Sequence, residues 1–192
     1  MMSSDSKARF SNRVENYVKF RPSYPAEAVD YLYSVVGMKA DSVIADIGAG
    51  TGIFSKLLLE QGSKVIAVEP NAAMREAADQ ELGASPNYRS HASAAEDTGL
   101  PANTVDFIVC AQSFHWFDRP AAQAEFHRIL KPGGKAVLIW NSRITSGTPF
   151  LEGYEQLLRL YSNDYEKMTH KNISGAQLQP FFRDGGMHTA VF

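Results

Sequence analysis

The stretch Val43-Ile44-Ala45-Asp46-Ile47-Gly48-Ala49-Gly50-Thr51-Gly52 decides the fold of this 192-residue chain. An apolar run typical of a buried strand passes through Asp46 and continues into three glycines at alternate positions. Glycine lets the backbone turn sharply and approach a ligand closely, because it has no Cβ. Residues 53–61 predict a helix whose N-terminal amides can point at that ligand. The stretch therefore predicts a cofactor-binding loop between a strand and a helix.

A second apolar strand, residues 64–69, ends in a carboxylate at Glu69, 17 residues beyond Gly52. An acidic side chain at this place can accept hydrogen bonds from both hydroxyls of a ribose. The dinucleotide pattern G-x-G-x-x-G, aligned on Gly48 and Gly50, would need a third glycine where Ile53 stands. The spacing therefore argues against a pyrophosphate cofactor, although an NAD-dependent oxidoreductase remains the alternative.

With Asp46 two residues before the first glycine, the loop reads D-x-G-x-G-x-G and resembles motif I of the class I S-adenosylmethionine-dependent methyltransferases. Later segments carry the same resemblance at the expected intervals. Residues 94–101 look like the family's adenine-binding turn, and residues 128–134 look like its connection from a helix to strand five. The resemblance covers roughly residues 43–141.

Two further segments, residues 17–25 and 111–118, are similar to the type 11 subgroup, many of whose members methylate small molecules. The resemblance implies S-adenosylmethionine as cofactor and in-line methyl transfer to a small-molecule acceptor. It implies that Met74 covers the adenine face, that Glu96 lies near the adenine amino group, and that Gln112 and Ser113 meet the sulfonium end. The implied cofactor positions are Asp46, Gly48, Ala49, Gly50, Thr51, Gly52, Glu69, Pro70, Met74, Ala95, Glu96, Gln112 and Ser113.

His115 is the candidate catalytic residue, because an imidazole can remove a proton from a hydroxyl, thiol or protonated amine around neutral pH. The alternative is that His115 only orients its loop. Arg21 stands between aromatics and prolines, where it could hold the carboxylate of the cofactor or of an acidic substrate. Tyr17 could share that task. A solvated surface arginine and a packed tyrosine are the alternative interpretations.

The chain alternates between strands and helices, which predicts an α/β fold with a mainly parallel sheet and helices on both faces, a Rossmann-like architecture. The expected strands are residues 43–47, 64–69, 87–91, 105–111 and 135–141, and the expected helices are residues 53–61, 71–82 and 119–130. Asn71 is the expected N-cap of the second helix, Gly83 its stop, and residues 132–134 a turn into the last strand.

We expect a single methyltransferase domain made of three parts: an N-terminal helical cap (1–36), a cofactor-binding core (37–141) and an incomplete C-terminal part (142–192). Sheets of this family normally end with strands six and seven, and the chain shows no strand seven. We therefore expect truncated C-terminal strands, since strand five would otherwise expose a long apolar edge. A short variant closed by a partner strand is the alternative, and the expected assembly is a monomer or a homodimer.

Charge and composition narrow the function further. The formal net charge of −2 provides no global positive field for nucleic acid, and there is no apolar run long enough to span a membrane. The start of the chain has no secretory signal, so a cytoplasmic location is expected. The five histidines show no compact ligand spacing, so no metal site is expected. A cofactor-binding regulatory protein without turnover remains a second alternative to an enzyme.

Overall fold

The computed structural model describes residues 21–162, 178–182 and 186–192. The chain divides into two compact units, one of residues 1–139 with 189–192 and the other of residues 140–188. The first unit contains the sheet and all the predicted site residues that the structure describes. Tyr17 lies outside the described part of the chain. The expected single domain remains a prediction.

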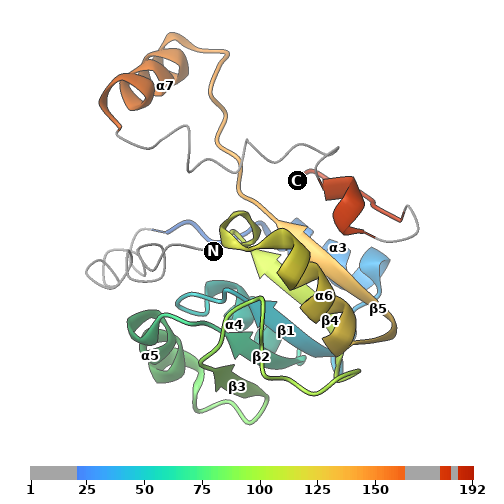
Figure 1. The fold of residues 1–192 in the computed structure, drawn as a ribbon. Helices are drawn as coiled ribbons and strands as arrows, with labels where there is room; N and C mark the ends of the chain where they lie inside the picture. The colour runs from blue at the N-terminus through green and yellow to red at the C-terminus, as the bar shows by residue number, and fades with distance from the viewer. Residues whose placement is uncertain (1–20, 163–177, 183–185) are drawn as a thin grey trace. The chain divides into compact units, whose positions relative to one another are not determined.

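The first unit contains a five-stranded sheet in the order β3-β2-β1-β4-β5, and every pair of neighbouring strands is parallel (Figure 1). The strands are β1 (Val43–Ile47), β2 (Lys64–Val68), β3 (Tyr88–His91), β4 (Val105–Ala111) and β5 (Leu130–Ile139). The order places β1 in the middle, between β2 and β4, so the carboxyl ends of these three parallel strands lie next to one another at the same edge. The first four strands confirm the sequence prediction to within one residue.

The fifth strand differs from its prediction, because it begins at Leu130 instead of residue 135. Leu130 pairs with Val105, and the next pair is Phe107 with Lys135, so the strand contains an irregular segment. Gly133 in this segment has a φ of +79°. The proline and glycines that we interpreted as a turn before the strand therefore form a bulge inside it.

Three helices follow the strands as expected: α4 (Ile53–Glu60), α5 (Ala72–Leu82) and α6 (Arg119–Ile129). Asn71 is the N-cap of α5, and its side chain accepts a hydrogen bond from the Met74 backbone N–H at 3.1 Å. Asp118 caps α6 in the same way through the Ala121 N–H. Gly83 is the C-cap residue of α5, as its helix-breaking character predicts.

One face of the sheet is covered by α4 and the segment that precedes β1. Ile44, Val65 and Phe107 project from three neighbouring strands into a buried cluster with Phe54 and Leu58 of α4. The same cluster includes residues around the π-helix η2 (Leu32–Val36), which continues α3 (Ala26–Tyr31). Residues 26–36 of the expected N-terminal cap are thus helical, and Leu32 packs in the same cluster as Ile44 of the first strand.

The other face of the sheet is covered by α6. Side chains of a strand alternate between faces, so Ala45, Ile108 and Cys110, all fully or almost fully buried, point away from α4. Phe126 and Ile129 of α6 are buried as well, and Figure 1 draws this helix across β4 and β5. The chain therefore has helices on both faces of a parallel sheet, which confirms the predicted fold class.

The second unit contains α7 (Pro149–Tyr161) and the short 3-10 helix η5 (Gln179–Phe181). Thr148 caps α7 by accepting the Leu151 N–H. Among the described residues of the chain, no helix is long and apolar enough to cross a membrane. Nor do those residues include a group of three or more metal-ligating side chains.

Candidate active site

The glycine loop connects β1 to α4 and folds back onto the end of β2. The Gly48 and Ala49 N–H groups donate to the Val68 carbonyl at 2.8 and 3.2 Å. Gly48, Gly50 and Gly52 have φ values of +71°, +58° and +78°, a backbone region that favours glycine. The alternate glycines of the sequence therefore provide the three left-handed positions that this loop requires.

At two of these glycines, an added Cβ would also meet a neighbouring side chain. A Cβ on Gly48 would lie 2.5 Å from the Cβ of Ser113, and a Cβ on Gly52 would lie 2.7 Å from a methyl carbon of Leu82. A Cβ on Gly50, by contrast, would meet nothing within 4 Å. The loop thus packs tightly against the end of β4 and against α5, and it is open at Gly50, where a ligand could approach the backbone.

Glu69 follows β2 and holds the open part of the loop. Its Oε2 accepts the Gly50 N–H at 2.9 Å, and its Oε1 accepts the Asn71 N–H at 2.8 Å. The side chain is buried, and this burial raises its pKa above the usual range despite both hydrogen bonds. Each carboxylate oxygen keeps a further lone pair that could accept a ribose hydroxyl.

Asp46 lies within β1, directly before the loop, and is fully buried. Its Oδ2 accepts a hydrogen bond from the Ser55 hydroxyl at 2.7 Å, whereas its Oδ1 has no hydrogen-bond partner among the described residues. Burial, the largest cause, raises the pKa of Asp46 to about 7, and the nearby Glu69 charge adds to the effect. A buried acceptor without a donor is costly, so Oδ1 is a candidate ligand contact.

The end of β4 approaches the loop through Gln112 and Ser113. The Ser113 hydroxyl donates to the Ile47 carbonyl at 2.6 Å, which joins the ends of β4 and β1. Gln112 has a φ of +59°, a strained conformation for a residue with a side chain, and its N–H donates to the Ile139 carbonyl. Such strain is often found at functional sites.

The predicted aromatic segment forms the 3-10 helix η3 (Phe114–Trp116). His115 is half-buried, and its ring centroid lies 4.9 Å from that of Trp116. Phe114 is fully buried and packs edge-on against Phe117 at 5.9 Å. Phe114 therefore belongs to the core, whereas His115 and Trp116 keep partial exposure next to the end of β4.

The predicted adenine-binding turn lies between β3 and β4, where Ala94 and Asp97 form an isolated antiparallel bridge. Ala95 is buried. Glu96 is half-buried and accepts the Asp118 N–H at 2.8 Å, so this carboxylate contacts the start of α6. The turn thus presents a carboxylate whose position depends on α6.

The remaining predicted residues differ in how far they are buried. Met74 is buried in the first turn of α5, and Pro70 is exposed just before that helix. Thr51 is buried in the loop, and its hydroxyl has no hydrogen-bond partner among the residues that the structure describes. Arg21 is exposed ahead of α3.

Sequence reasoning missed Ser55, which donates to Asp46, and the second role of Asn71, whose N–H donates to Glu69. A polar residue inside the apolar face of α4, between Phe54 and Leu58, is the signal for Ser55. It could have been recognised as a partner for the buried acid of the preceding strand.

Comparisons with known proteins agree with this geometry. Residues 45–138 match the family model described as a methyltransferase domain. An uncharacterized methyltransferase of Mycobacterium tuberculosis is 37% identical over 139 residues, which cover 72% of this chain and 54% of that protein. A solved structure from Anaeromyxobacter dehalogenans, assigned as a type II methyltransferase, is 33% identical with a TM-score of 0.56, and the match covers 77% of this chain and 59% of that one.

A third likeness concerns the fold alone. The structure assigned as an S-adenosyl-L-methionine-dependent methyltransferase of Methanococcus maripaludis has a TM-score of 0.67 at 24% identity, and the match covers 90% of this chain and 80% of that one. A parallel sheet with a glycine loop after β1 and an acid after β2 defines a Rossmann-like cofactor-binding protein.

The family match specifies the class further: the chain belongs to the class I S-adenosylmethionine-dependent methyltransferases. This result confirms the predicted family and its cofactor, S-adenosylmethionine. The chain spans between 54% and 59% of the length of curated relatives from Mycobacterium and Schizosaccharomyces pombe.

Proposed function

We propose that this chain binds S-adenosylmethionine at the carboxyl ends of β1, β2 and β4 and transfers its methyl group to a small-molecule acceptor. The observation that carries the proposal is the contact between the Glu69 carboxylate and the Gly50 N–H at the one loop glycine with open space around it. This contact holds the Glu69 carboxylate, which can accept the ribose hydroxyls, beside the Gly50 backbone, which a ligand can approach.

The residues present fit this cofactor. S-adenosylmethionine carries a positive sulfonium and a positive amino group, and the site provides two buried carboxylates, Asp46 and Glu69. Asp46 has a free acceptor oxygen, Oδ1, in the described structure. A dinucleotide would instead bring a negatively charged pyrophosphate to the glycine loop that follows Asp46, and this loop has Ile53 where the dinucleotide pattern needs its third glycine.

We assign the predicted contacts within this arrangement as follows. Gly48, Ala49, Gly50, Thr51 and Gly52 line the methionine and ribose portions. Glu69 accepts the ribose hydroxyls, and Pro70 and Met74 flank the adenine. The turn at Ala95 and Glu96 contacts the edge of the adenine that carries the amino group. Gln112 and Ser113 face the sulfonium end, and Tyr17 or Arg21 holds a carboxylate.

The bound cofactor supplies an electrophilic methyl group on a sulfonium, so the protein chiefly has to position the acceptor in line with it. Such positioning can contribute about 7 to 11 kcal/mol in favourable cases. His115 and Trp116 follow the end of β4, where they can contact an acceptor. We propose that His115 removes the proton that the acceptor nucleophile loses.

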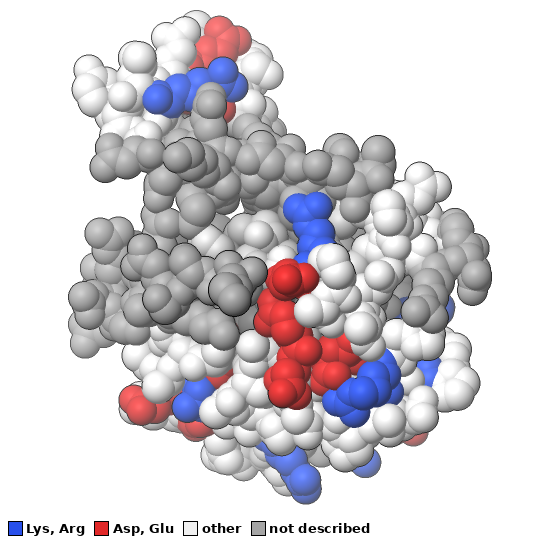
Figure 2. Space-filling model, in the orientation of Figure 1, with Lys and Arg blue, Asp and Glu red and all other residues white. Residues whose placement is uncertain are grey.

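A small molecule is the favoured acceptor class for two reasons. The end of β4 reads Ala111-Gln112-Ser113-Phe114, which differs from the N/D-P-P-Y/F motif of methyltransferases that modify nucleic-acid amino groups. On the face drawn in Figure 2, acidic and basic side chains stand in small mixed groups rather than in one basic field. Neither feature favours a phosphate backbone as ligand.

The test is isothermal titration of the chain with S-adenosylhomocysteine and, separately, with NAD, followed by a methyl-transfer screen of small acceptors. We expect micromolar binding of S-adenosylhomocysteine alone, and turnover with at least one acceptor. Binding of NAD alone would support an oxidoreductase instead. Cofactor binding without turnover on any acceptor would support a regulatory role.

A further inference from the structure

The turn between β3 and β4 is attached to α6 at two points. At its middle, Glu96 accepts the Asp118 N–H, which belongs to the N-cap of α6. At its end, the Thr98 N–H donates to Oε1 of Glu125 at 2.9 Å, and the Thr98 hydroxyl donates to the same oxygen. Glu125 lies in the middle of α6, so the turn is hydrogen-bonded both to the start and to the middle of this helix.

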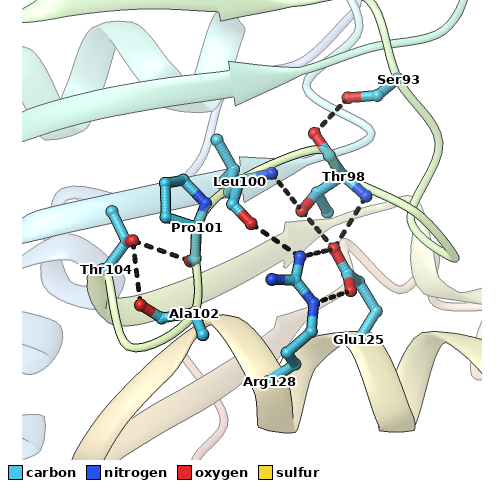
Figure 3. A network of polar contacts seen from close by, with 8 residues as sticks. All are labelled: Ser93, Thr98, Leu100, Pro101, Ala102, Thr104, Glu125 and Arg128. Carbon is cyan, nitrogen blue, oxygen red and sulfur yellow. Dashed lines mark hydrogen bonds and ion pairs between the residues drawn. The ribbon is translucent and has the colours of Figure 1, made fainter.

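Arg128 completes the second attachment, as Figure 3 shows. Its Nε donates to Oε2 of Glu125 at 2.7 Å, and its Nη2 donates both to Oε1 of Glu125 and to the Leu100 carbonyl, each at 2.7 Å. The Leu100 N–H in turn donates to the Thr98 hydroxyl at 3.2 Å. The Glu125 carboxylate therefore holds residue 98, and the Arg128 guanidinium holds residue 100.

The Glu125 carboxylate is a fixed anchor because it is buried and charged. It accepts four hydrogen bonds, two from Thr98 and two from Arg128. The hydrogen bonds from Arg128, the largest cause, lower the pKa of Glu125 to about 2. Removing one donor would leave part of a buried charge unsatisfied, so Thr98 would have to move or admit water.

We propose that Thr98, Glu125 and Arg128 are positioning residues for recognition of the cofactor's adenine, although none of them touches the cofactor. The inference rests on the proposed function. Glu96 is itself one point of attachment and Thr98, the other, follows two residues later, so the network at Thr98 restricts where the backbone of Glu96 and its carboxylate can stand. A hydrogen bond from the adenine amino group requires its acceptor within a few tenths of an ångström, because such bonds weaken steeply with poor geometry.

The proposal predicts a loss of base selectivity. We would compare binding of S-adenosylhomocysteine with binding of S-inosylhomocysteine, in which an oxygen replaces the adenine amino group. The variants Thr98→Val and Arg128→Ala each remove part of the network. Thr104→Val is the matched control, because among the described residues the Thr104 hydroxyl donates only to the nearby Pro101 and Ala102 carbonyls (Figure 3).

We expect the parent chain and Thr104→Val to prefer S-adenosylhomocysteine, and Thr98→Val and Arg128→Ala to reduce that preference about tenfold. A general loss of stability would lower the affinity for both ligands by the same factor and leave the preference for S-adenosylhomocysteine unchanged. That result would overturn the inference. Thr98→Val removes one donor to Glu125 and leaves Arg128 in place, so it retains the test if Arg128→Ala does not fold.

Two results with the parent chain separate this inference from the proposed function. Binding of S-adenosylhomocysteine without preference over the inosine analogue would refute adenine recognition by the turn and leave the methyltransferase proposal intact. Binding of neither ligand would refute the proposed function, and the inference with it.

Discussion

The Glu69 carboxylate accepts the Gly50 N–H at 2.9 Å, so the acid that ends β2 directly fixes the conformation of the loop that follows β1. The two residues are 19 positions apart in the chain. Glu69 therefore shapes the loop, and we propose that its remaining lone pairs also accept hydrogen bonds from the cofactor.

This double role predicts a graded effect of substitution at Glu69. Glu69→Ala removes a charge-assisted pair of hydrogen bonds, so we expect S-adenosylhomocysteine binding to weaken by about 1 to 3 kcal/mol in calorimetry. Glu69→Gln keeps an acceptor oxygen and should lose less. The control is Glu81→Gln, which changes an exposed carboxylate paired with Lys56. Unchanged affinity in Glu69→Ala would contradict the ribose assignment.

The loop glycines should respond differently to a single added methyl group. Gly48→Ala would place a Cβ 2.5 Å from Ser113, so we expect about 1 to 3 kcal/mol of lost stability from overpacking, in addition to backbone strain. Gly50→Ala meets nothing within 4 Å and should cost only the strain, about 1 to 2 kcal/mol. Urea unfolding of both variants measures the difference. Equal losses would show that packing against Ser113 is unimportant.

Asp46 should make stability depend on pH. Its pKa is raised from 3.8 to about 7, so the folded chain keeps a proton that the unfolded chain releases, and stability should fall as pH rises between these values. Asp46→Asn imitates the protonated form. We expect it to be more stable than the parent at pH 8, by at most about 4 kcal/mol, and to show no gain near pH 3.5.

Thermal unfolding at several pH values tests this expectation. Asp41→Asn, at an exposed position, controls for the loss of one negative charge. A gain in Asp46→Asn that is the same at both ends of the pH range would refute burial of an ionisable carboxyl as its cause. Because Asp46 is also a proposed cofactor contact, the stabilised variant should bind S-adenosylhomocysteine more weakly than the parent.

Glu125 should make stability depend on pH in the opposite direction to Asp46. Its pKa is lowered to about 2, chiefly by Arg128, so its contribution to stability is complete above the unfolded pKa and is lost as pH falls toward 2. Arg128→Ala should therefore shift acid-induced unfolding, followed by circular dichroism, to higher pH. Lys56→Ala breaks an exposed ion pair and should leave the transition nearly in place. Coincident transitions for parent and Arg128→Ala would contradict the assignment.

His115 tests catalysis separately from cofactor binding. If His115 is the general base, His115→Ala should lower kcat by about 10² to 10⁴ and leave the affinity for S-adenosylhomocysteine nearly unchanged. His115→Gln, which retains a polar side chain of similar reach, distinguishes loss of the base from loss of loop structure. Parallel losses of turnover and of cofactor affinity in both variants would indicate that His115 only supports its loop.

The features that local chemistry dictates could be predicted from the sequence alone. Three alternate glycines after an apolar run specify a left-handed loop, because only glycine adopts such backbone angles without strain. The strand and helix bounds, the Asn71 cap and the acid after β2 follow from similarly local signals. The bulge in β5 could not be predicted, because the pairing of Leu130 with Val105 depends on the neighbouring strand.

Only the tertiary structure decided which distant groups act on one another. Ser55 donates to Asp46, Ser113 to Ile47, and Thr98 to Glu125, and the partners in these pairs are 9, 66 and 27 residues apart. Sequence patterns record the residue types that chemistry needs and the local backbone that holds them. Burial and hydrogen bonding between elements set the pKa of Asp46 and the position of the turn around Glu96. The first arises when α4 packs on the sheet, and the second when α6 does.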